Sequence, residues 1–256
     1  MRRLHLVELE DLPWFPRAIR DGATNYLAWI TKRGNQIESF VPALEKLLRR
    51  TGERELVDLC SGGSGPTPDV VSLLRARGLD VRATLTDFYP NIDAFRSVCA
   101  ESGGALSYSE KSVDATAVPE SLPGARTIWN AFHHFRPEQA RQILGAAVRA
   151  RQPIAVLEIL SREPLFLLSL LFSPVVAVLT APFWRPFRWS TLFFSWVVPV
   201  IPFVIVFDGV VSWLRIYSEP ELRELVTPFG DYDWEIGKVR LGGPPVHGTY
   251  LIGSPR

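Results

Sequence analysis

Three acidic residues, each expected close to the end of a β-strand, could together bind a nucleoside. Asp58 precedes a run of small residues, Cys60–Gly65, which lets the backbone approach a ligand closely. Asp87 comes 22 residues after Gly65, and a carboxylate there can accept both hydroxyls of a ribose. Asp114 stands where a carboxylate could accept an amine such as adenine N6. This pattern predicts a site for a ligand with a ribose and a base.

The elements that position these acids alternate between strand and helix. Runs typical of strands cover 55–60, 81–86, 106–108, 125–130 and 153–160, and helical patterns cover 67–77, 90–101 and 137–151. Repeated β-α-β units imply a mostly parallel sheet, in which ligands bind beyond the carboxyl ends of the strands. The three acids are therefore expected on one edge of the sheet.

The two ends of the chain complete this pattern. Residues 12–50 have helical periodicity, with a new helix expected near Pro42. A helix capped by Ser218 is followed by two strands, 234–241 and 246–252, joined by the turn Gly242–Pro245. A turn this short makes the last two strands antiparallel.

In this order of elements and motifs, the sequence resembles the class I S-adenosylmethionine-dependent methyltransferases of the small-molecule type, over about residues 53–160 and 215–256. The resemblance implies an α/β fold with a Rossmann-like seven-stranded sheet, a terminal antiparallel hairpin and S-adenosylmethionine as the cofactor. The family's loop, acid-x-Gly-x-Gly-x-Gly, is matched only in part. Cys60 and Ser64 stand at two of the glycine positions, and Gly63 and Gly65 fall between them.

The resemblance assigns the ribose to Asp87, a place near the adenine to Phe88, and the adenine amine to Asp114. Asp58 has a second interpretation, in which it only holds amides of the loop, and Asp87 could also cap the following helix. The predicted cofactor-binding residues are Asp58, Cys60, Ser61, Gly62, Gly63, Asp87, Phe88, Asp114, Ala115 and Asn130.

The fourth strand ends in the motif Asn130–Phe135, which resembles the His-His-Phe motif of small-molecule methyltransferases. His133 and His134 are the candidate catalytic residues, because an imidazole can take a proton near neutral pH. The alternative is that both only pack in the loop, since many methyl transfers need mainly alignment of the reactants. Glu158 interrupts the apolar fifth strand and could face the site or accept backbone amides.

An apolar insertion, defined as residues 163–207, follows the fifth strand. Residues 164–184 and 189–207 carry no charge, and Arg185 and Arg188 lie between them. The first run could form about 31 Å of helix, enough to cross a bilayer core. Four prolines, Pro174, Pro182, Pro199 and Pro202, are expected to break both helices, and a hairpin would place the arginines on the far side. Short helices dipping into one leaflet are therefore favoured, with a soluble lid or a homodimer interface as the alternative.

Composition excludes several other classes of protein. A formal net charge of +1 gives no electrostatic basis for nucleic-acid binding. The two cysteines and four histidines have no metal-ligand spacing, so no metal is predicted. The N-terminus has no apolar run typical of a secretion signal, which predicts a cytoplasmic protein at the inner face of a membrane.

Four segments are expected: a helical cap (1–52), a cofactor-binding α/β core (53–162), the apolar insertion (163–207), and a C-terminal part of the core with the hairpin (208–256). The predicted function is methyl transfer to an O, N or C atom of an apolar small molecule or lipid-like acceptor, at or near a membrane surface. Two alternatives are an NAD(P)-dependent oxidoreductase and a non-catalytic, membrane-associated scaffold. The absence of Gly-x-Gly-x-x-Gly spacing argues against the oxidoreductase.

Overall fold

The computed structural model describes residues 3–242 and 246–256, and the chain divides into two compact units. Unit 1 comprises residues 1–36, 160–217 and 240–247, and unit 2 comprises 37–159, 218–239 and 248–256. This division differs from the four predicted segments at two places. Residues 37–52 belong with the α/β core, and the expected boundary after residue 207 falls inside a helix that continues to Arg215.

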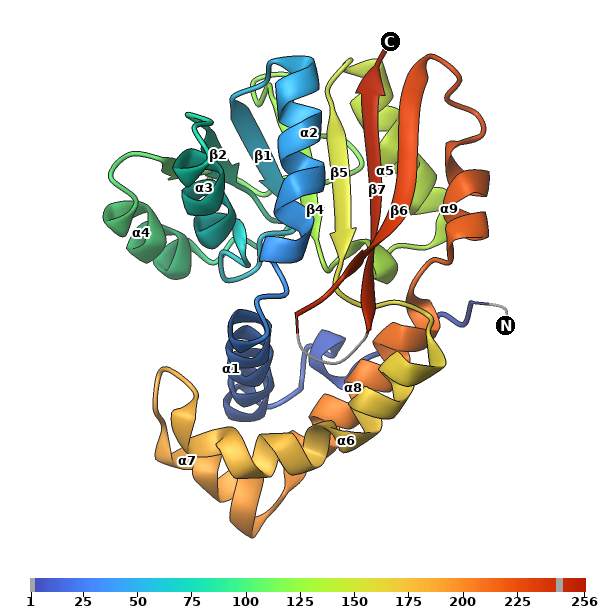
Figure 1. The fold of residues 1–256 in the computed structure, drawn as a ribbon. Helices are drawn as coiled ribbons and strands as arrows, with labels where there is room; N and C mark the ends of the chain where they lie inside the picture. The colour runs from blue at the N-terminus through green and yellow to red at the C-terminus, as the bar shows by residue number, and fades with distance from the viewer. Residues whose placement is uncertain (1–2, 243–245) are drawn as a thin grey trace. The chain divides into compact units, whose positions relative to one another are not determined.

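Unit 2 is built on a seven-stranded sheet in the order β3-β2-β1-β4-β5-β7-β6 (Figure 1). The first five strands are parallel, and β7 pairs antiparallel with β5. The strands are β1 (Glu55–Leu59), β2 (Arg82–Leu85), β3 (Leu106–Tyr108), β4 (Ala125–Trp129), β5 (Ile154–Glu158), β6 (Tyr232–Arg240) and β7 (His247–Pro255). The predicted fold class, including the terminal antiparallel hairpin, is confirmed. Within the expected turn, residues 243–245 lie outside the described part of the chain.

Helices cover both faces of the sheet, with α2 in front and α5 behind in Figure 1. The helices of unit 2 are α2 (Val41–Thr51), α3 (Thr67–Ala76), α4 (Ile92–Glu101), α5 (Pro137–Arg149) and α9 (Glu219–Val226). Local sequence sets their ends: α2 stops at Gly52, whose φ of 76° suits glycine. A capping box between Ser218 and Glu221 starts α9.

Unit 1 is helical. It contains α1 (Arg17–Arg33), α6 (Pro164–Thr180), α7 (Trp189–Leu192) and α8 (Val200–Arg215), with a π-helical turn η5 (Phe193–Val197) and short 3-10 turns η1 (Leu9–Asp11) and η4 (Ala181–Phe183). Its core joins α1 to α8 and to η4. Gly22 of α1 lies directly against the side chain of Ile201, and Tyr26 packs edge-on against Trp184, with ring centroids 5.3 Å apart.

The expectation that all four prolines break helices is wrong for two of them. Pro174 lies inside α6, and Pro202 lies in the first turn of α8, where the missing N–H has no helical partner to lose. Pro182 does lie in the 3-10 turn that follows α6, and Pro199 lies in the break before α8.

Among residues 3–242 and 246–256, one helical stretch, Pro164–Phe183, could cross a membrane by length and composition alone, and 22% of its apolar window is buried. The helices Trp189–Val197 and Val200–Arg215 meet the same criteria when they are taken together as one span, which is bent by 80° at the break between them.

Candidate functional site

Asp58 of β1 is the centre of a buried hydrogen-bond cluster. The residue is 1% exposed. Its Oδ2 accepts the hydroxyls of Ser61 and Thr67, both at 2.7 Å, and its Oδ1 accepts that of Thr127 at 2.8 Å. Burial raises the pKa of Asp58 to about 6. The hydrogen bonds from the three hydroxyls act in the opposite direction and lower this pKa. Both oxygens therefore hold the start of the loop against β4 and α3. The predicted contact of Asp58 with a cofactor stays a prediction.

The loop after β1 has positive φ at each glycine position of the resembled motif. The φ angles are 62° at Cys60, 56° at Gly62 and 93° at Ser64, whereas Gly63 is outside the left-handed region. A non-glycine residue there costs about 1–2 kcal/mol. Backbone strain of this kind gathers at functional sites. At two of these positions, Cys60 and Ser64, the backbone therefore has the left-handed conformation that favours glycine although the residue is not glycine.

Asp87, after β2, is joined to this loop. Its Oδ2 accepts the amide of Gly62 at 2.8 Å, and its Oδ1 accepts that of Tyr89, also at 2.8 Å. Phe88 is 51% exposed, and Ser112 donates to its carbonyl at 2.7 Å. The carboxylate and an exposed aromatic ring therefore lie side by side in sequence next to the loop.

Asp114 lies in the segment after β3 that packs along the end of β2. The amide of Val113 donates to the carbonyl of Asp87 at 2.9 Å, which brings the two acidic segments together. Asp114 is exposed, and its Oδ1 accepts the amide and the hydroxyl of Thr116 at 2.8 and 2.7 Å. Ala115 is buried.

The end of β4 carries Asn130 and the two histidines. Asn130 has φ 49° and accepts the amide of Ile159 at 3.3 Å, which links β4 to β5. Glu158 accepts the backbone amide of His133 at 3.0 Å and lies 2.9 Å from its Nδ1. His133 is 2% exposed, whereas His134 is half-buried, and their ring centroids are 4.4 Å apart. The structure thus fixes His133 through Glu158 and leaves His134 more accessible.

The carboxylates of the site give it a negative electrostatic potential. Burial raises the pKa of the Cys60 thiol to about 12, with further contributions from four carboxylates. These carboxylates belong to Asp87, Asp58, Asp114 and Glu158. A thiol with this pKa is protonated at neutral pH, and a positively charged ligand is favoured beside it.

All predicted site residues lie in unit 2, with Asp58 near the end of β1 and the others beyond the carboxyl ends of β1–β4. Sequence reasoning missed Thr67 and Thr127, which hold Asp58. The one available signal was Thr127, a polar residue in the middle of the fourth strand.

Neither protein-family models nor curated protein sequences gave a match to the chain. Solved structures do resemble it. The plantazolicin methyltransferase BpumL in complex with SAH has a TM-score of 0.57 and 12% identity, covering 97% of this chain and 94% of that one. The pyocyanin biosynthetic protein PhzM has a TM-score of 0.53 and 14% identity, covering 88% and 56%. The methyltransferase domain of bacterial CtHen1-C has a TM-score of 0.50 and 10% identity, covering 86% and 98%.

The fold is therefore that of the class I S-adenosylmethionine-dependent methyltransferases, as the sequence resemblance implied. At these identities the likeness concerns the fold, and the chemistry has to be argued from the site.

Proposed function

We propose that this protein transfers a methyl group from S-adenosylmethionine to an apolar, lipid-like acceptor at a membrane surface. The observation that carries the first part is the loop after β1: its glycine-type backbone is joined to Asp87 through the Gly62 amide.

The residues fit the cofactor. A Cβ added to Gly62 or Gly63 would meet no atom within 4 Å, so the outer side of the loop is open. Asp87 would hold the ribose hydroxyls, Phe88 would lie against the adenine, and Asp114 would accept the adenine amine. The carboxylates around Cys60 favour a cation, and S-adenosylmethionine carries positive charge.

When bound, the cofactor supplies an electrophilic methyl group on a positively charged sulfur. What the protein must add is mainly alignment of the acceptor atom with that methyl group. His134, the more accessible histidine, would take a proton from an O–H or N–H acceptor, and the Glu158–His133 pair would keep the loop in place.

Two measurements test the methyl transfer. Calorimetry with S-adenosylhomocysteine should give binding, and no binding at high micromolar ligand would contradict the proposal. Incubation with S-adenosylmethionine carrying an isotope-labelled methyl group and a lipid extract should give a labelled product by mass spectrometry. Binding without any labelled product would favour the scaffold alternative.

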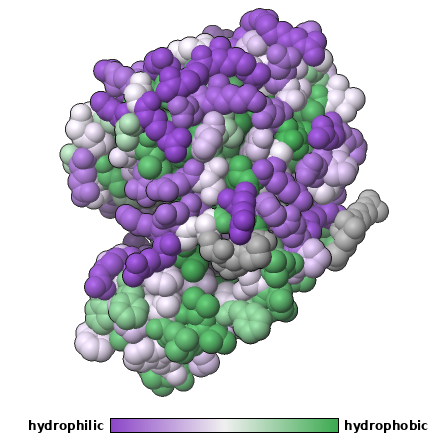
Figure 2. Space-filling view, viewed as in Figure 1, coloured by the Kyte–Doolittle hydropathy of each residue, from purple (hydrophilic) through white to green (hydrophobic). Residues whose placement is uncertain are grey.

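The membrane part rests on the surface of α6–α8. Large apolar side chains are exposed on it, and Figure 2 shows apolar residues gathered over these helices. The most exposed are Phe172, Leu179, Phe183, Trp189 and Val197, at 60%, 70%, 63%, 77% and 68%. A core helix of a soluble protein would be mostly buried, whereas only 22% of the Pro164–Phe183 window is. A surface of this kind supports contact with a lipid or a protein.

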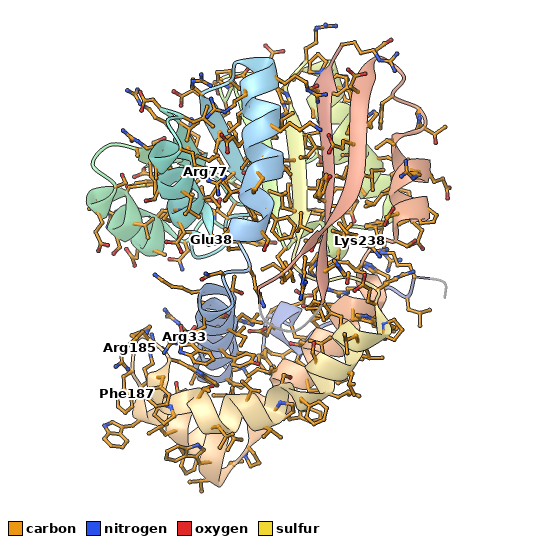
Figure 3. All side chains as sticks on the ribbon, viewed as in Figure 1. Arg33, Glu38, Arg77, Arg185, Phe187 and Lys238 are labelled. Atoms are coloured by element: carbon orange, nitrogen blue, oxygen red, sulfur yellow. The ribbon has the colours of Figure 1, made fainter. Side chains whose placement is uncertain are left out.

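The charged residues of this surface favour a lipid over a protein as its partner. Between Pro164 and Phe207, the sequence has no acidic residue, and its charges are Arg185 and Arg188. Figure 3 shows Arg185 and Phe187 projecting from the loop between η4 and α7. Arg188 pairs with Asp21 of α1. Arg185 is therefore the residue whose charge would meet the headgroups of an anionic membrane, with the exposed Trp189 close by in sequence. The 80° bend before α8 supports helices lying in one leaflet over a straight crossing.

Flotation with vesicles of phosphatidylcholine and phosphatidylglycerol tests this part. The protein should float with the vesicles, and the double variant Leu179→Glu, Trp189→Glu should remain at the bottom. The variant Tyr89→Glu, an 83% exposed aromatic residue of unit 2, is the control and should float. If the wild-type protein does not float with the vesicles, membrane association is contradicted. The methyl-transfer proposal is unaffected by that result.

A further inference from the structure

A cavity of about 520 Å³ lies in unit 2 at the amino ends of β4 and β5. Its walls combine apolar and polar surface in nearly equal parts, with residues from 117–123 on one side and from α5 on the other. Its size falls in the range of small-molecule sites. Because the cofactor loop follows the carboxyl ends of the strands, this cavity belongs to the opposite edge of the sheet.

Arg126, the second residue of β4, lines this cavity and is 3% exposed. Its Nε and Nη1 are sealed from solvent and have no hydrogen-bond partner within residues 3–242 and 246–256. Buried polar groups are nearly always hydrogen-bonded, and a buried guanidinium without an anion is strongly unfavourable. Burial and the nearby Arg149 lower the pKa of Arg126, although Tyr232 opposes this.

Two polar side chains around Arg126, Gln152 of the cavity lining and Tyr232, already have other partners. Gln152 Oε1 accepts the amide of Gly124 at 2.9 Å. The hydroxyl of Tyr232 lies 3.0 Å from the carbonyl of Ala147 and 3.1 Å from that of Gln152. These contacts tie the cavity walls together and leave the positive charge of Arg126 without a counter-charge within the described residues.

Two further charged residues line the cavity. Arg149 of α5 is exposed and adds a second positive charge. Glu120 also lines it and is exposed. The net charge of the cavity lining is positive, because Arg126 and Arg149 outweigh Glu120 and Arg126 is the charged residue that is buried.

We propose that this cavity binds a small molecule whose anionic oxygen group, a carboxylate or a phosphate, pairs with Arg126 and whose remainder is apolar. Because Nε and Nη1 are sealed from solvent, Nη2 is the nitrogen through which Arg126 would donate to an oxygen of either group. The apolar part of the walls, with Val118, Leu122 and Ala146, would hold the rest of the molecule. Arg126 and Asn130 lie at opposite ends of β4, about 13 Å apart along an extended strand. This ligand is therefore neither the cofactor nor the methyl acceptor.

Calorimetry and thermal unfolding of the full chain, with inorganic phosphate or octanoate against chloride at equal ionic strength, test the proposal. At tenfold excess over the Kd, either anion should raise Tm by about 3–5 °C. A response to phosphate alone assigns a phosphorylated ligand, and a response to octanoate alone assigns a fatty carboxylate. No response to either anion would overturn the proposal.

Variants connect the response to the arginine. Arg126→Met should abolish it and, without added anion, should raise Tm, because an uncompensated buried charge is removed. Arg149→Met changes an exposed side chain, so it should fold and should weaken binding at least about threefold. Arg82→Met, an exposed arginine at the amino end of β2, is the control and should respond as the wild type does. An anion response that survives in Arg126→Met would also overturn the proposal.

Discussion

Asp87 Oδ2 accepts the backbone amide of Gly62 at 2.8 Å, which joins the end of β2 to the loop after β1. One carboxylate thus holds the loop and, in the proposed function, the ribose as well. Two acidic side chains at neighbouring strand ends have separate tasks, because Asp58 is enclosed by hydroxyls and Asp87 remains partly accessible.

Asp87→Ala should weaken binding of S-adenosylhomocysteine by about 1–3 kcal/mol, roughly 5- to 150-fold. The variant removes the acceptor for the ribose and the anchor of Gly62 together. Calorimetry gives the affinity, with Asp93→Ala as the control, since that carboxylate on α4 is 96% exposed. An affinity equal to that of the wild type would remove Asp87 from the site.

Gly62→Ala and Gly63→Ala should have opposite effects on stability. Gly62 has φ 56°, so a Cβ there should lower the free energy of unfolding by about 1 kcal/mol. Gly63 lacks positive φ and has open space around it, so alanine there should be neutral or stabilise by up to about 1 kcal/mol. Urea unfolding measures both. Equal losses in the two variants would mean that the loop has a different register.

Asp58→Asn should change how stability depends on pH. Burial raises the pKa of Asp58 from 3.8 to about 6, so the folded protein keeps a proton that the unfolded chain has released between these values. This contribution to stability is fully present below pH 3.8 and is lost as the pH rises through about 6.

Relative to Asp58→Asn, the wild type should therefore lose about 2 kcal/mol of stability between pH 4 and 6.5 and change little above that. Chemical unfolding across this range measures the difference. The exposed Asp69→Asn is the control. A wild type that gains stability over the variant as the pH rises would show that the carboxyl is ionised throughout.

Glu158→Ala should destabilise the protein by about 3 kcal/mol, because the buried backbone amide of His133 and its ring both lose this acceptor. Glu138→Ala, an exposed residue in the first turn of α5, should have little effect. Thermal unfolding compares the two variants. If Glu158→Ala unfolds at the wild-type temperature, the pair does not hold the loop after β4.

Much of the fold could be predicted from local sequence. The strands were expected where they lie, to within about three residues at each end, because the change between apolar runs and helical periodicity is a local property. The antiparallel hairpin followed from the short turn between its strands. The prolines were less informative, since the effect of Pro174 or Pro202 depends on where in a helix each falls.

The sequence by itself determined which residue types stand at the strand ends, and hence the kind of ligand expected there. Only the tertiary structure decided what each acid does. Asp58 and Asp87 look alike in sequence, but the partner that closes the cluster around Asp58 is Thr127, 69 residues away. Likewise, Arg126 reads as an ordinary charge in a strand, and its burial without a partner depends on what packs around β4. Contacts between distant segments form only when the chain folds, so local pattern carries no record of them.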